Sequence, residues 1–462
     1  MIRVAAEFRV SIGFALTDVT RYPAKMRPTF PYLFLAILIG ATACVSAKDF
    51  LAGADMSHLQ FFESQGKIYK DAGQTQDALA ILKQHGLNCV RLRLFTSSAA
   101  QASADPYSFV NNFDYTVSLA VRVKNAGLRF YLDFHYSDTW ADPGHQAVPS
   151  AWTNLTFTAL VAQVRSYNSN TIAAFRAAGA MPDYVSVGNE ITSGLLWPHG
   201  RVGGSYDNPI QWSQLGQLLR AAVQGIQNAA AGTLVPKIIV HIDRGGDWAT
   251  TQWFFDNLNA QGVPFDLVGE SYYPFWHGSL TSLSNCLNNT ANRYHKPVIV
   301  AETAFPWTNS YWPTAIGGLN PSVTDQIQYV VALAPIIKGV AGGQGAGVFW
   351  WGPEYQRVNG VNEAGFDTTS FFDAGGNLLP AAHACGQLAA PLVLNISSTT
   401  NGCLLTWPLS GAGVSLMNTT DLKPLTVWSP MPTQAQNTGT LYWLTLPPDS
   451  SPQRFYRLQS NW

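Results

Sequence analysis

Two glutamates follow short apolar, β-branched stretches of this sequence, at the points where polar residues begin. Glu190 comes after residues 184–188 and stands next to Asn189, and Glu302 ends the stretch 298–302. A pair of carboxyl groups can cleave a glycosidic bond, because one protonates the leaving oxygen while the other attacks or activates water. The sequence therefore predicts a catalytic carboxyl pair, provided that the fold brings the two strand ends together.

The residues around Glu190 suit the binding of a sugar. Trp197 and Pro198 follow it within one loop, and Asn189 precedes it. A sugar ring has an apolar face that packs on an indole and hydroxyl groups that an amide can bind. A single glutamate at a strand end also has a structural explanation, since it can cap the next helix. The presence of a second glutamate, Glu302, at another predicted strand end favours the catalytic interpretation of Glu190.

The composition favours an uncharged partner. Of the 462 residues only 12% are charged, against about a quarter in ordinary soluble proteins. Aromatic residues also reach 12%, among them 15 tryptophans, and the formal net charge is −1. Because the sequence has no basic run, nothing indicates binding to nucleic acid or to anionic lipid.

Strand-like and helix-like stretches alternate from residue 50 onward. The predicted strands are residues 50–55, 89–95, 129–135, 184–190, 237–243, 267–272, 298–302 and 347–351. The predicted helices are 75–85, 115–125, 155–178, 211–230, 253–261, 280–294 and 322–340. This alternation favours a parallel (β/α)8 TIM barrel over residues 48–387. An open doubly wound sheet is disfavoured, because no glycine-rich phosphate loop follows the first strand.

Polar side chains gather at the carboxyl ends of these strands, where such a barrel builds its active site. They are Asp55, Arg91, Arg93, Asp133, His135, Asn189, Glu190, His241, Asp243, Tyr272, Tyr273, Glu302, Trp350 and Trp351. The acids that compete with the two glutamates are Asp55, Asp133, Asp243 and Glu270. A buried acid there can pair with Arg91, Arg93 or Arg244, and we favour this structural role over catalysis.

Several longer motifs resemble one family of glycosidases. They are Gly53-Ala-Asp55-Met-Ser57, Asn88-Cys-Val-Arg91-Leu-Arg93, the run from Asp133 to Pro143, Gly188-Asn189-Glu190, Gly194-Leu-Leu-Trp197-Pro198, Ser271-Tyr-Tyr-Pro274-Phe and Glu302-Thr303. Over residues 50–387 the chain resembles the endo-β-1,4-galactanases of glycoside hydrolase family 53, in clan A. Asn-Glu alone is common to the clan, whereas Ser-Asp-Thr-Trp-Ala-Asp-Pro and Gly-Leu-Leu-Trp-Pro are far more specific.

The resemblance implies a retaining, endo-acting hydrolase of β-1,4-galactan, with Glu190 as general acid/base and Glu302 as nucleophile. It also implies that Asn189 binds the sugar 2-hydroxyl and that Tyr272 or Tyr273 holds the nucleophile. The predicted substrate-binding residues are Arg91, His135, Asp138, Trp140, Asn189, Trp197, Tyr272, Tyr273 and Trp351. The candidate stacking platforms are Trp140, Trp197, Trp276, Trp307 and Trp351.

Two rival functions stay open. The same glutamates would serve another clan A endoglycanase, such as a β-mannanase or a β-glucanase. A catalytically silent barrel could bind polysaccharide, although such a protein has no need of two opposed acids. We expect a monomer without a cofactor. Some bacterial relatives bind calcium near strand eight, but Asp367 and Asp373 form no compact ligand pattern, so no metal is predicted.

One departure from the family lies after the eighth strand. The family usually ends that strand with Trp-Glu-Pro and an aromatic residue, whereas this chain has Trp351-Gly352-Pro353-Glu354-Tyr355. A strand-end carboxylate is therefore missing or displaced. The two catalytic glutamates are unaffected, but the subsites beside strand eight should differ in shape.

Residues 1–47 have the order of an N-terminal extension with a secretory signal. Lys25-Met26-Arg27 precedes an apolar run over 30–43, and Val45-Ser46-Ala47 suits a cleavage site. We expect cleavage after Ala47 and a secreted or periplasmic bacterial protein that is not attached to a membrane. The alternatives are a membrane anchor or a lipoprotein site at Cys44, and Met26 rather than Met1 is a second candidate start.

Residues 388–462 lack helical periodicity and indicate a small all-β domain, similar to those of many exported bacterial hydrolases. Its Trp407, Trp428 and Trp443 suit either sugar binding or core packing, and we favour packing. The cysteines that remain after the expected cleavage are Cys89, Cys286, Cys385 and Cys403, which allow three pairings. A buried free thiol is the simpler interpretation for Cys89.

Overall fold

The computed structural model describes residues 50–230, 232–310, 318–400, 402–420, 427–447 and 454–460. The signal peptide, its cleavage after Ala47 and the choice between Met1 and Met26 lie outside these described residues. Among the helices that are described, none is both long and apolar enough to cross a membrane. The cysteines Cys89, Cys286, Cys385 and Cys403 are free thiols, which confirms the simpler interpretation of Cys89.

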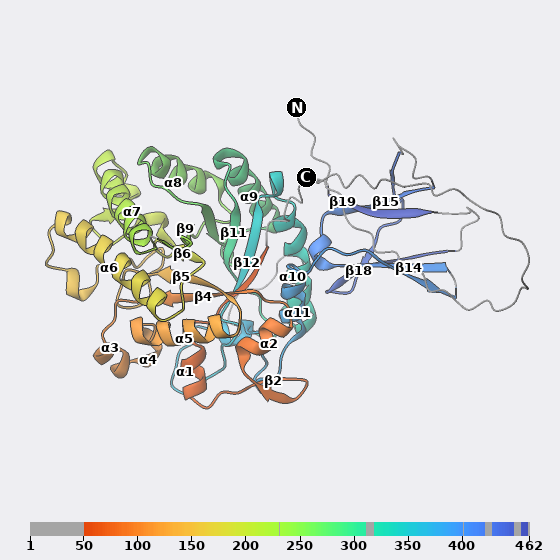
Figure 1. The fold of residues 1–462 in the computed structure, drawn as a ribbon, viewed down its shortest axis with the longest axis horizontal. Helices are drawn as coiled ribbons and strands as arrows, with labels where there is room; N and C mark the ends of the chain where they lie inside the picture. The colour runs from red at the N-terminus through yellow and green to blue at the C-terminus, as the bar shows by residue number, and fades with distance from the viewer. Residues whose placement is uncertain are drawn as a thin grey trace, which may run out of the picture.

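Eight parallel strands close into a barrel, as the sequence predicts. Around the barrel they are β1 (Leu51–Asp55), β4 (Cys89–Leu94), β5 (Arg129–Phe134), β6 (Tyr184–Ser186), β9 (Lys237–Ile242), β10 (Leu267–Ser271), β11 (Val298–Thr303) and β12 (Gly345–Trp351). Strand β1 closes the barrel, because it pairs with β4 on one side and with β12 on the other. Figure 1 shows helices around these strands.

The helices connect successive strands on the outside of the barrel. They are α1 (Leu59–Ser64), α2 (Ala78–Gln84), α3 (Ala99–Ala104), α4 (Pro106–Phe109), α5 (Phe113–Asn125), α6 (Phe157–Ala177), α7 (Pro209–Ala229), α8 (Trp248–Ala260), α9 (Leu280–Tyr294), α10 (Val323–Lys338) and α11 (Pro380–Gln387). Polar caps begin several of them: the Thr156 side chain accepts a hydrogen bond from the Ala159 N–H at the start of α6. Two hairpins, β2 (Tyr69–Asp71) with β3 (Gln74–Gln76) and β7 (Gly194–Leu195) with β8 (Gly200–Arg201), extend the loops.

Apolar side chains fill the barrel interior beneath the polar strand ends. The interior cluster consists of Leu51, Cys89, Tyr131, Ile239, Leu267, Ile299, Ala301 and Phe349, all buried. The Phe349 ring occupies the space beside Gly53, where an added Cβ would lie 2.3 Å from Cε1 of the ring. This packing fills the N-terminal half of the barrel, so that the polar site lies at the opposite end.

Strand β6 ends earlier than the sequence pattern suggests. Residues 184–190 were expected to be extended, but regular pairing ends at Ser186, and both Gly188 and Glu190 have positive φ, of 116° and 48°. A Cβ on Gly188 would meet Cγ2 of Ile191 at 2.6 Å, so only glycine fits this turn. The chain thus bends sharply at Gly188 and Glu190. An apolar, strand-type sequence pattern does not predict this backbone conformation.

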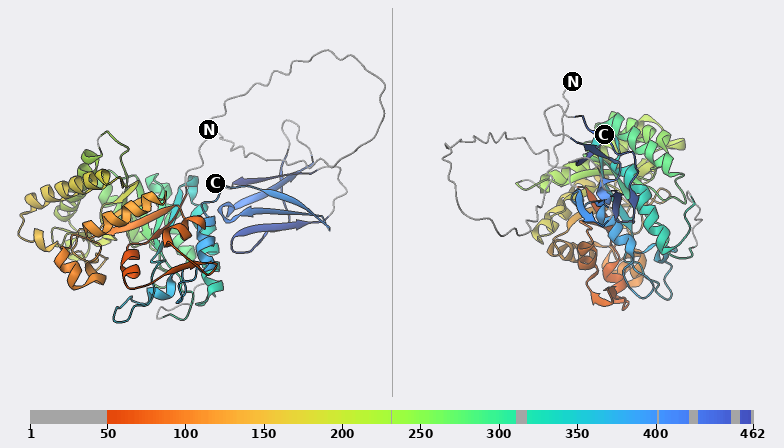
Figure 2. Two further views of the ribbon diagram at one scale, coloured as in Figure 1. Left: turned by 60° about the horizontal axis from the view of Figure 1, so that its bottom comes forward. Right: turned by 90° about the vertical axis from the view of Figure 1, so that its right-hand side faces the viewer.

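The C-terminal residues form a separate small domain of two antiparallel sheets. One sheet has the order β13 (Asn395–Thr399), β14 (Gly402–Pro408), β18 (Leu441–Leu446), β17 (Gln436–Asn437). The other has the order β16 (Ser429–Pro430), β15 (Val414–Thr419), β19 (Phe455–Ser460). Leu405, Leu416, Leu444 and Leu458 pack in its core. Figures 1 and 2 show this domain beside the barrel, next to α10 and α11.

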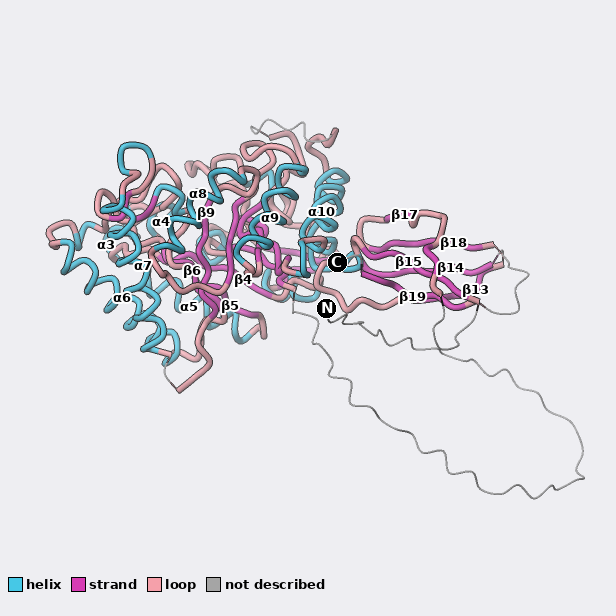
Figure 3. Tube along the Cα trace, turned by 90° about the horizontal axis from the view of Figure 1, so that it is seen from above, coloured by secondary structure: helices cyan, strands magenta, loops and turns pink. Residues whose placement is uncertain are grey.

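The two domains share apolar contacts. Leu409 and Ala412 of the small domain belong to the main core of the barrel, and Tyr442 packs against that core. Gly439 approaches Ile327 of α10 so closely that a Cβ would lie 2.5 Å from its Cγ2. In the view from above in Figure 3, α10 lies between the barrel strands and strands β15 and β18 of the small domain. The small domain is therefore packed against the barrel rather than tethered to it.

Candidate active site

Glu190 and Glu302 meet at the mouth of the barrel. Glu190 follows β6 and Glu302 lies in β11. One carboxylate oxygen of each, together with one ring nitrogen of His241, lie within 4.8 Å of one another. Carboxyl groups about 5–5.5 Å apart are typical of retaining glycosidases, whereas inverting enzymes keep them about 6.5–9.5 Å apart. The short spacing fits direct attack by one carboxylate.

Arg91 of β4 connects the polar groups at the mouth. Its guanidinium lies 2.8 Å from Asp55, 2.7 Å from Asp133 and 2.8 Å from Glu302. It also donates a hydrogen bond of 2.7 Å to Oδ1 of Asn189. Because Arg91 is completely buried, its charge is stable only with such partners. Asp55 and Asp133 thus have the structural role that the sequence favours.

The two glutamates differ in their electrostatic surroundings. Burial and the neighbouring Glu302 and Asp243 raise the pKa of Glu190 well above that of an ordinary glutamate. Burial also raises the pKa of Glu302, to about 7, but the Arg91 guanidinium and the Tyr273 hydroxyl oppose that rise. Because Glu302 is in ion-pair contact with Arg91, the proton of the pair belongs on Glu190. The pair consists of one acid and one carboxylate.

One of the two adjacent tyrosines holds Glu302. The Tyr273 hydroxyl donates a hydrogen bond of 2.9 Å to Oε2 of Glu302. Tyr272, which was also predicted to bind substrate, is fully buried, and its hydroxyl donates to the Gly278 carbonyl at 2.7 Å. Both tyrosines follow the end of β10, and of the two Tyr273 is the one that contacts Glu302.

Asn189 and His135 fix the loop that follows β5. Nδ2 of Asn189 donates a hydrogen bond of 2.7 Å to the Ala141 carbonyl. Nδ1 of His135 accepts one of 2.9 Å from the Ala141 N–H, and its Nε2 lies 3.2 Å from Asp133. Burial lowers the pKa of His135, so the ring is neutral and Nε2–H faces the carboxylate. Sugar contacts of Asn189 and His135 stay predictions.

Arg93 joins two of the predicted tryptophan platforms. The centre of its guanidinium lies 4.3 Å from the Trp140 ring and 4.5 Å from the Trp351 ring. Nδ1 of His58 accepts a hydrogen bond of 2.8 Å from Arg93 and its ring stacks on Trp140 at 5.3 Å. The buried Nε1 of Trp351 has no hydrogen-bond partner in the described part of the chain. Both indoles are thus oriented by a cation, and Trp351 has a donor available for a hydroxyl group.

The other platform candidates lie in loops. Trp197 carries the guanidinium of Arg201 at 4.2 Å from its ring, and its Nε1 donates to the Ser193 carbonyl at 2.9 Å. Trp276 is 50% exposed, whereas Trp307 is half-buried and donates to the backbone of residue 367. Its greater exposure makes Trp276 the better candidate stacking surface of the last two.

Asp138 connects two loops through its carboxylate. It accepts hydrogen bonds from the Thr96 hydroxyl at 2.7 Å, the Gln101 amide at 3.2 Å and the Ser150 N–H at 3.0 Å. These donors hold the loops after β4 and β5 together. Its predicted role in substrate binding stays a prediction, and its contacts within the protein explain its position.

The remaining acids hold the loop after β9. Asp243 lies 3.2 Å from the guanidinium of Arg244 and accepts a hydrogen bond from the Thr192 hydroxyl. Glu270 accepts hydrogen bonds from the Arg244 N–H at 3.2 Å and from the Thr251 hydroxyl at 3.3 Å. Both contacts are structural, as expected for acids beside Arg244.

Glu354 is the acid that replaces the usual strand-end carboxylate. Its side chain is completely buried, and Oε1 accepts a hydrogen bond of 3.0 Å from the His58 N–H, whereas Oε2 has no hydrogen-bond partner among the described residues. Burial and the nearby Asp55 raise the pKa of Glu354 to about 8. The Glu354 carboxyl group therefore lies next to His58, which contacts Arg93, and it holds the backbone of the segment that carries His58.

We expect Glu354→Gln to stabilise the protein increasingly as the pH rises. The unfolded glutamate loses its proton near its ordinary pKa of about 4.3, whereas the folded one keeps it up to a pKa of about 8. Between these values the unfolded state binds fewer protons, so stability falls with pH, and glutamine removes that loss. Melting temperatures at pH 5, 6, 7 and 8 measure the effect.

Glu63→Gln provides the control for this series. Glu63 lies in α1, is partly exposed and pairs with Arg122, so its replacement should bring no gain that grows with pH. A Glu354→Gln variant whose difference from the unmodified protein stays constant from pH 5 to pH 8 would show that Glu354 is ionised in the folded state.

Glu190, His241 and Glu302 are the one group of three metal-type ligands within the described part of the chain. Burial lowers the pKa of His241 to about 3, so the ring is neutral, and Nε2 lies 2.9 Å from the Ser271 hydroxyl. Glu302 is already paired with Arg91. The arrangement is explained by a carboxyl pair and does not require an ion.

Asp367 and Asp373, the acids considered for calcium, have other partners. Asp367 lies 3.6 Å from Arg357, and Asp373 accepts hydrogen bonds from the N–H groups of Gly375 and Asn377. We therefore expect exhaustive dialysis against a chelator to leave the rate of hydrolysis unchanged, as measured by reducing-sugar release. A loss of more than half of the rate that added Ca²⁺ restores would contradict this prediction.

Two histidines of the site are not among the site residues that the sequence predicts. His241 was noted at a strand end but not assigned, and it lies beside both glutamates. His58 was not considered, although it follows the motif Asp55-Met-Ser57 directly, and it contacts Arg93 and Trp140. The available signal in both cases was a polar residue near the carboxyl end of a strand, since His241 is the penultimate residue of β9 and His58 follows shortly after β1.

The barrel and the carboxyl pair at its mouth define the class: a glycoside hydrolase of the (β/α)8 type. Comparison with known families identifies the family within this class. The model of glycosyl hydrolase family 53 matches residues 51–385, and the chain belongs to this family.

Three relatives illustrate the match. An uncharacterised protein of Niallia circulans is 40% identical over 320 residues, which are 67% of this chain and 84% of that protein. An arabinogalactan endo-β-1,4-galactanase of Humicola insolens is 35% identical over 334 residues, 70% and 95% of the two chains. A fungal β-1,4-galactanase of known structure superposes with a TM-score of 0.65 at 32% identity, over 72% of this chain and 98% of that one.

Proposed function

We propose that this protein is an endo-acting β-1,4-galactanase that hydrolyses pectic galactan or type I arabinogalactan with retention of configuration. Family membership supports the substrate class, since the relative from Humicola insolens bears that activity in its name. The observation that carries the mechanism is the carboxyl pair, with oxygens of Glu190 and Glu302 within 4.8 Å.

In the first step Glu302 acts as the nucleophile. Its ionised carboxylate, held by Arg91 and Tyr273, attacks the anomeric carbon while the glycosidic C–O bond breaks. Glu190 gives its proton to the leaving oxygen, so the leaving sugar departs as a neutral alcohol. The product is a galactosyl ester of Glu302, with inverted configuration at the anomeric carbon.

In the second step Glu190 acts as the base. Now ionised, it takes a proton from a water molecule whose oxygen attacks the anomeric carbon from the side that the leaving group vacated. The ester C–O bond breaks, Glu302 regains its carboxylate and Glu190 is protonated again. Two inversions give net retention, and one water molecule is consumed for each bond cleaved.

The binding of an uncharged polymer agrees with the aromatic mouth. Arg93 holds Trp140 and Trp351 at the mouth, and Trp276 is exposed. Aromatic side chains around a site suit the apolar faces of sugar rings. We also propose a secreted monomer, released by cleavage after Ala47.

A panel of polysaccharides tests the proposed substrate. Reducing-sugar release is measured on debranched β-1,4-galactan, β-1,4-mannan and β-1,4-glucan at equal mass concentration. Rapid release from galactan, at a rate more than about tenfold above that on the other two, is the expected result, since tenfold corresponds to about 1.4 kcal/mol of discrimination. A preference for mannan or glucan would show that the protein is another endoglycanase of the same clan rather than a galactanase.

A further inference from the structure

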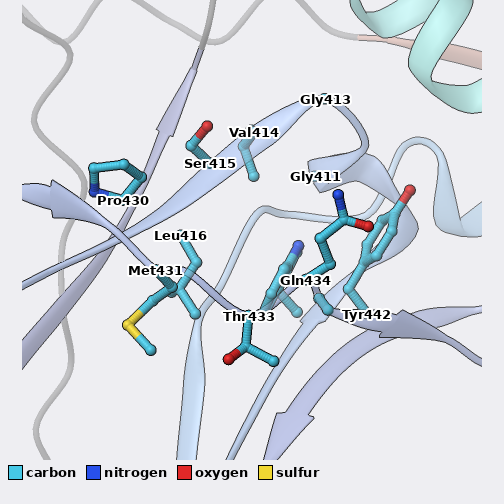
Figure 4. Close-up of a pocket in the computed structure, with 12 residues that line it drawn as sticks. Gly411, Gly413, Val414, Ser415, Leu416, Pro430, Met431, Thr433, Gln434 and Tyr442 are labelled. Atoms are coloured by element: carbon cyan, nitrogen blue, oxygen red, sulfur yellow. The ribbon is translucent and has the colours of Figure 1, made fainter.

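The small C-terminal domain contains a cavity of 340 Å³, here called the β-domain cavity. Its lining includes the aromatic residues Trp407 and Tyr442 and the polar residues Ser415, Thr433 and Gln434. Figure 4 shows these polar side chains, together with Leu416 and Met431, among the residues that line the cavity. The catalytic mechanism uses none of these residues.

The lining determines what kind of molecule fits. None of the residues that line the β-domain cavity is charged, so phosphates, carboxylates and cations would find no counter-charge there. Trp407 and Tyr442 stack with ring centres 5.7 Å apart and planes at 19°, which gives one wall an aromatic surface. Hydroxyl and amide groups of Thr433 and Gln434 are exposed at the rim. Such a lining suits a neutral molecule with an apolar face and many hydroxyl groups.

An unpartnered donor also lies at the cavity. Nε1 of Trp407 is buried and has no hydrogen-bond partner among the residues that the structure describes, although buried indole N–H groups usually have one. That edge of the ring faces Gly411, which lines the cavity: a Cβ there would lie 2.7 Å from Cδ1 and 3.3 Å from Nε1 of Trp407. The indole N–H edge of Trp407 therefore lies directly behind a glycine of the cavity lining.

We infer that the β-domain cavity is a second sugar-binding site, which holds one or two pyranose units of the galactan that the barrel cleaves. The volume is at the lower end of ligand pockets, about 300–1,000 Å³, and fits a ligand of that size. The choice of galactan rests on the proposed function. On this proposal Trp407 has both of the roles considered from the sequence, because it packs in the core of the domain and also lines the cavity.

The attachment of the domain gives such a site a use. Tyr442, which lines the cavity, also packs against the barrel core, as do Leu409 and Ala412. A polysaccharide held there stays near the barrel, which raises the effective concentration of the polymer at the active site. The site would assist the capture of long chains more than that of short ones.

Calorimetry with full-length protein tests this inference. β-1,4-Linked galactotetraose is titrated into the inactive Glu302→Gln chain, alone and combined with the cavity changes Thr433→Ala and Gln434→Ala. We expect two sites for each Glu302→Gln chain, and only one after the cavity changes, whose hydrogen-bond loss should weaken the second site at least about tenfold. Thr433 and Gln434 are exposed, so the changes should not disturb folding.

Gln436→Ala is the matched control, because Gln436 is exposed two residues from Gln434 but does not line the cavity. Two sites should persist in this variant. A Glu302→Gln chain that has a single site from the start, which the cavity changes leave intact, would overturn the inference, and so would two sites that both persist after the cavity changes. A single site that the cavity changes abolish would support the cavity and overturn galactan as the ligand of the barrel, which the polysaccharide panel tests by itself.

Discussion

Glu302→Gln should abolish hydrolysis of galactan, with a fall in rate of roughly 10⁴-fold or more, because loss of a nucleophile removes the covalent step. The amide has nearly the same shape as the carboxylate, and Arg91 keeps Asp55 and Asp133 as partners. Binding of galactotetraose to the barrel should therefore persist. Rates from reducing-sugar release and affinities from calorimetry measure the two effects separately.

Azide distinguishes the nucleophile from the acid/base. In Glu302→Ala, azide would attack an activated galactoside in place of the carboxylate and give the α-galactosyl azide. In Glu190→Ala, azide would replace the attacking water in the second step and give the β-galactosyl azide. Glu63→Gln on α1 is the control for the glutamine change and should keep the full rate. A near-normal rate for Glu302→Gln, or the same azide anomer from both alanine variants, would refute the assignments.

Arg91→Lys should lower the rate by about 10²–10³-fold, a loss similar to that caused by removing one preorganised donor from an active site. The charge of a lysine is confined to one ammonium group, whereas the planar guanidinium reaches several partners at once. These partners are Asp55, Asp133, Asn189 and Glu302. Arg91 lowers the pKa of Glu302, and Glu302 must be ionised to attack. The variant should thus raise that pKa and move the acid limb of the pH–rate profile to higher pH.

The pH profile separates this electrostatic role from a purely structural one. A variant that is merely less stable would lose rate equally across the pH range in which it stays folded. Arg122→Lys, at the surface pair with Glu63, is the matched control and should leave the profile unchanged. An acid limb at the same pH in Arg91→Lys and in the unmodified protein would show that another group holds Glu302 ionised.

The barrel and the carboxyl pair were predictable because their signals are local. Each strand is a short apolar stretch with a polar end, and closure of a parallel barrel brings such ends together whatever the loops do. The pairing of buried acids with Arg91 also followed from residue type, since a buried charge needs a partner. Glu190 and Glu302 could therefore be placed at one mouth from the sequence and its resemblance to a family.

The details that depend on contacts between distant loops were not predictable. Tyr272 and Tyr273 follow the end of β10, so an apolar strand pattern does not show which of them reaches Glu302. The left-handed turn at Glu190 is imposed by packing around Gly188. The displaced acid Glu354 meets His58 nearly 300 residues away along the chain, a contact for which no local rule exists.

The anomeric form of the first product tests the central claim most directly. Proton nuclear magnetic resonance follows the hydrolysis of β-1,4-galactan during the first minutes, before the new reducing ends equilibrate. The account predicts that the β-anomer of the new reducing end appears first and that the α-anomer grows later by mutarotation. An α-anomer that appears first would contradict attack by Glu302 and the carboxyl pair as described.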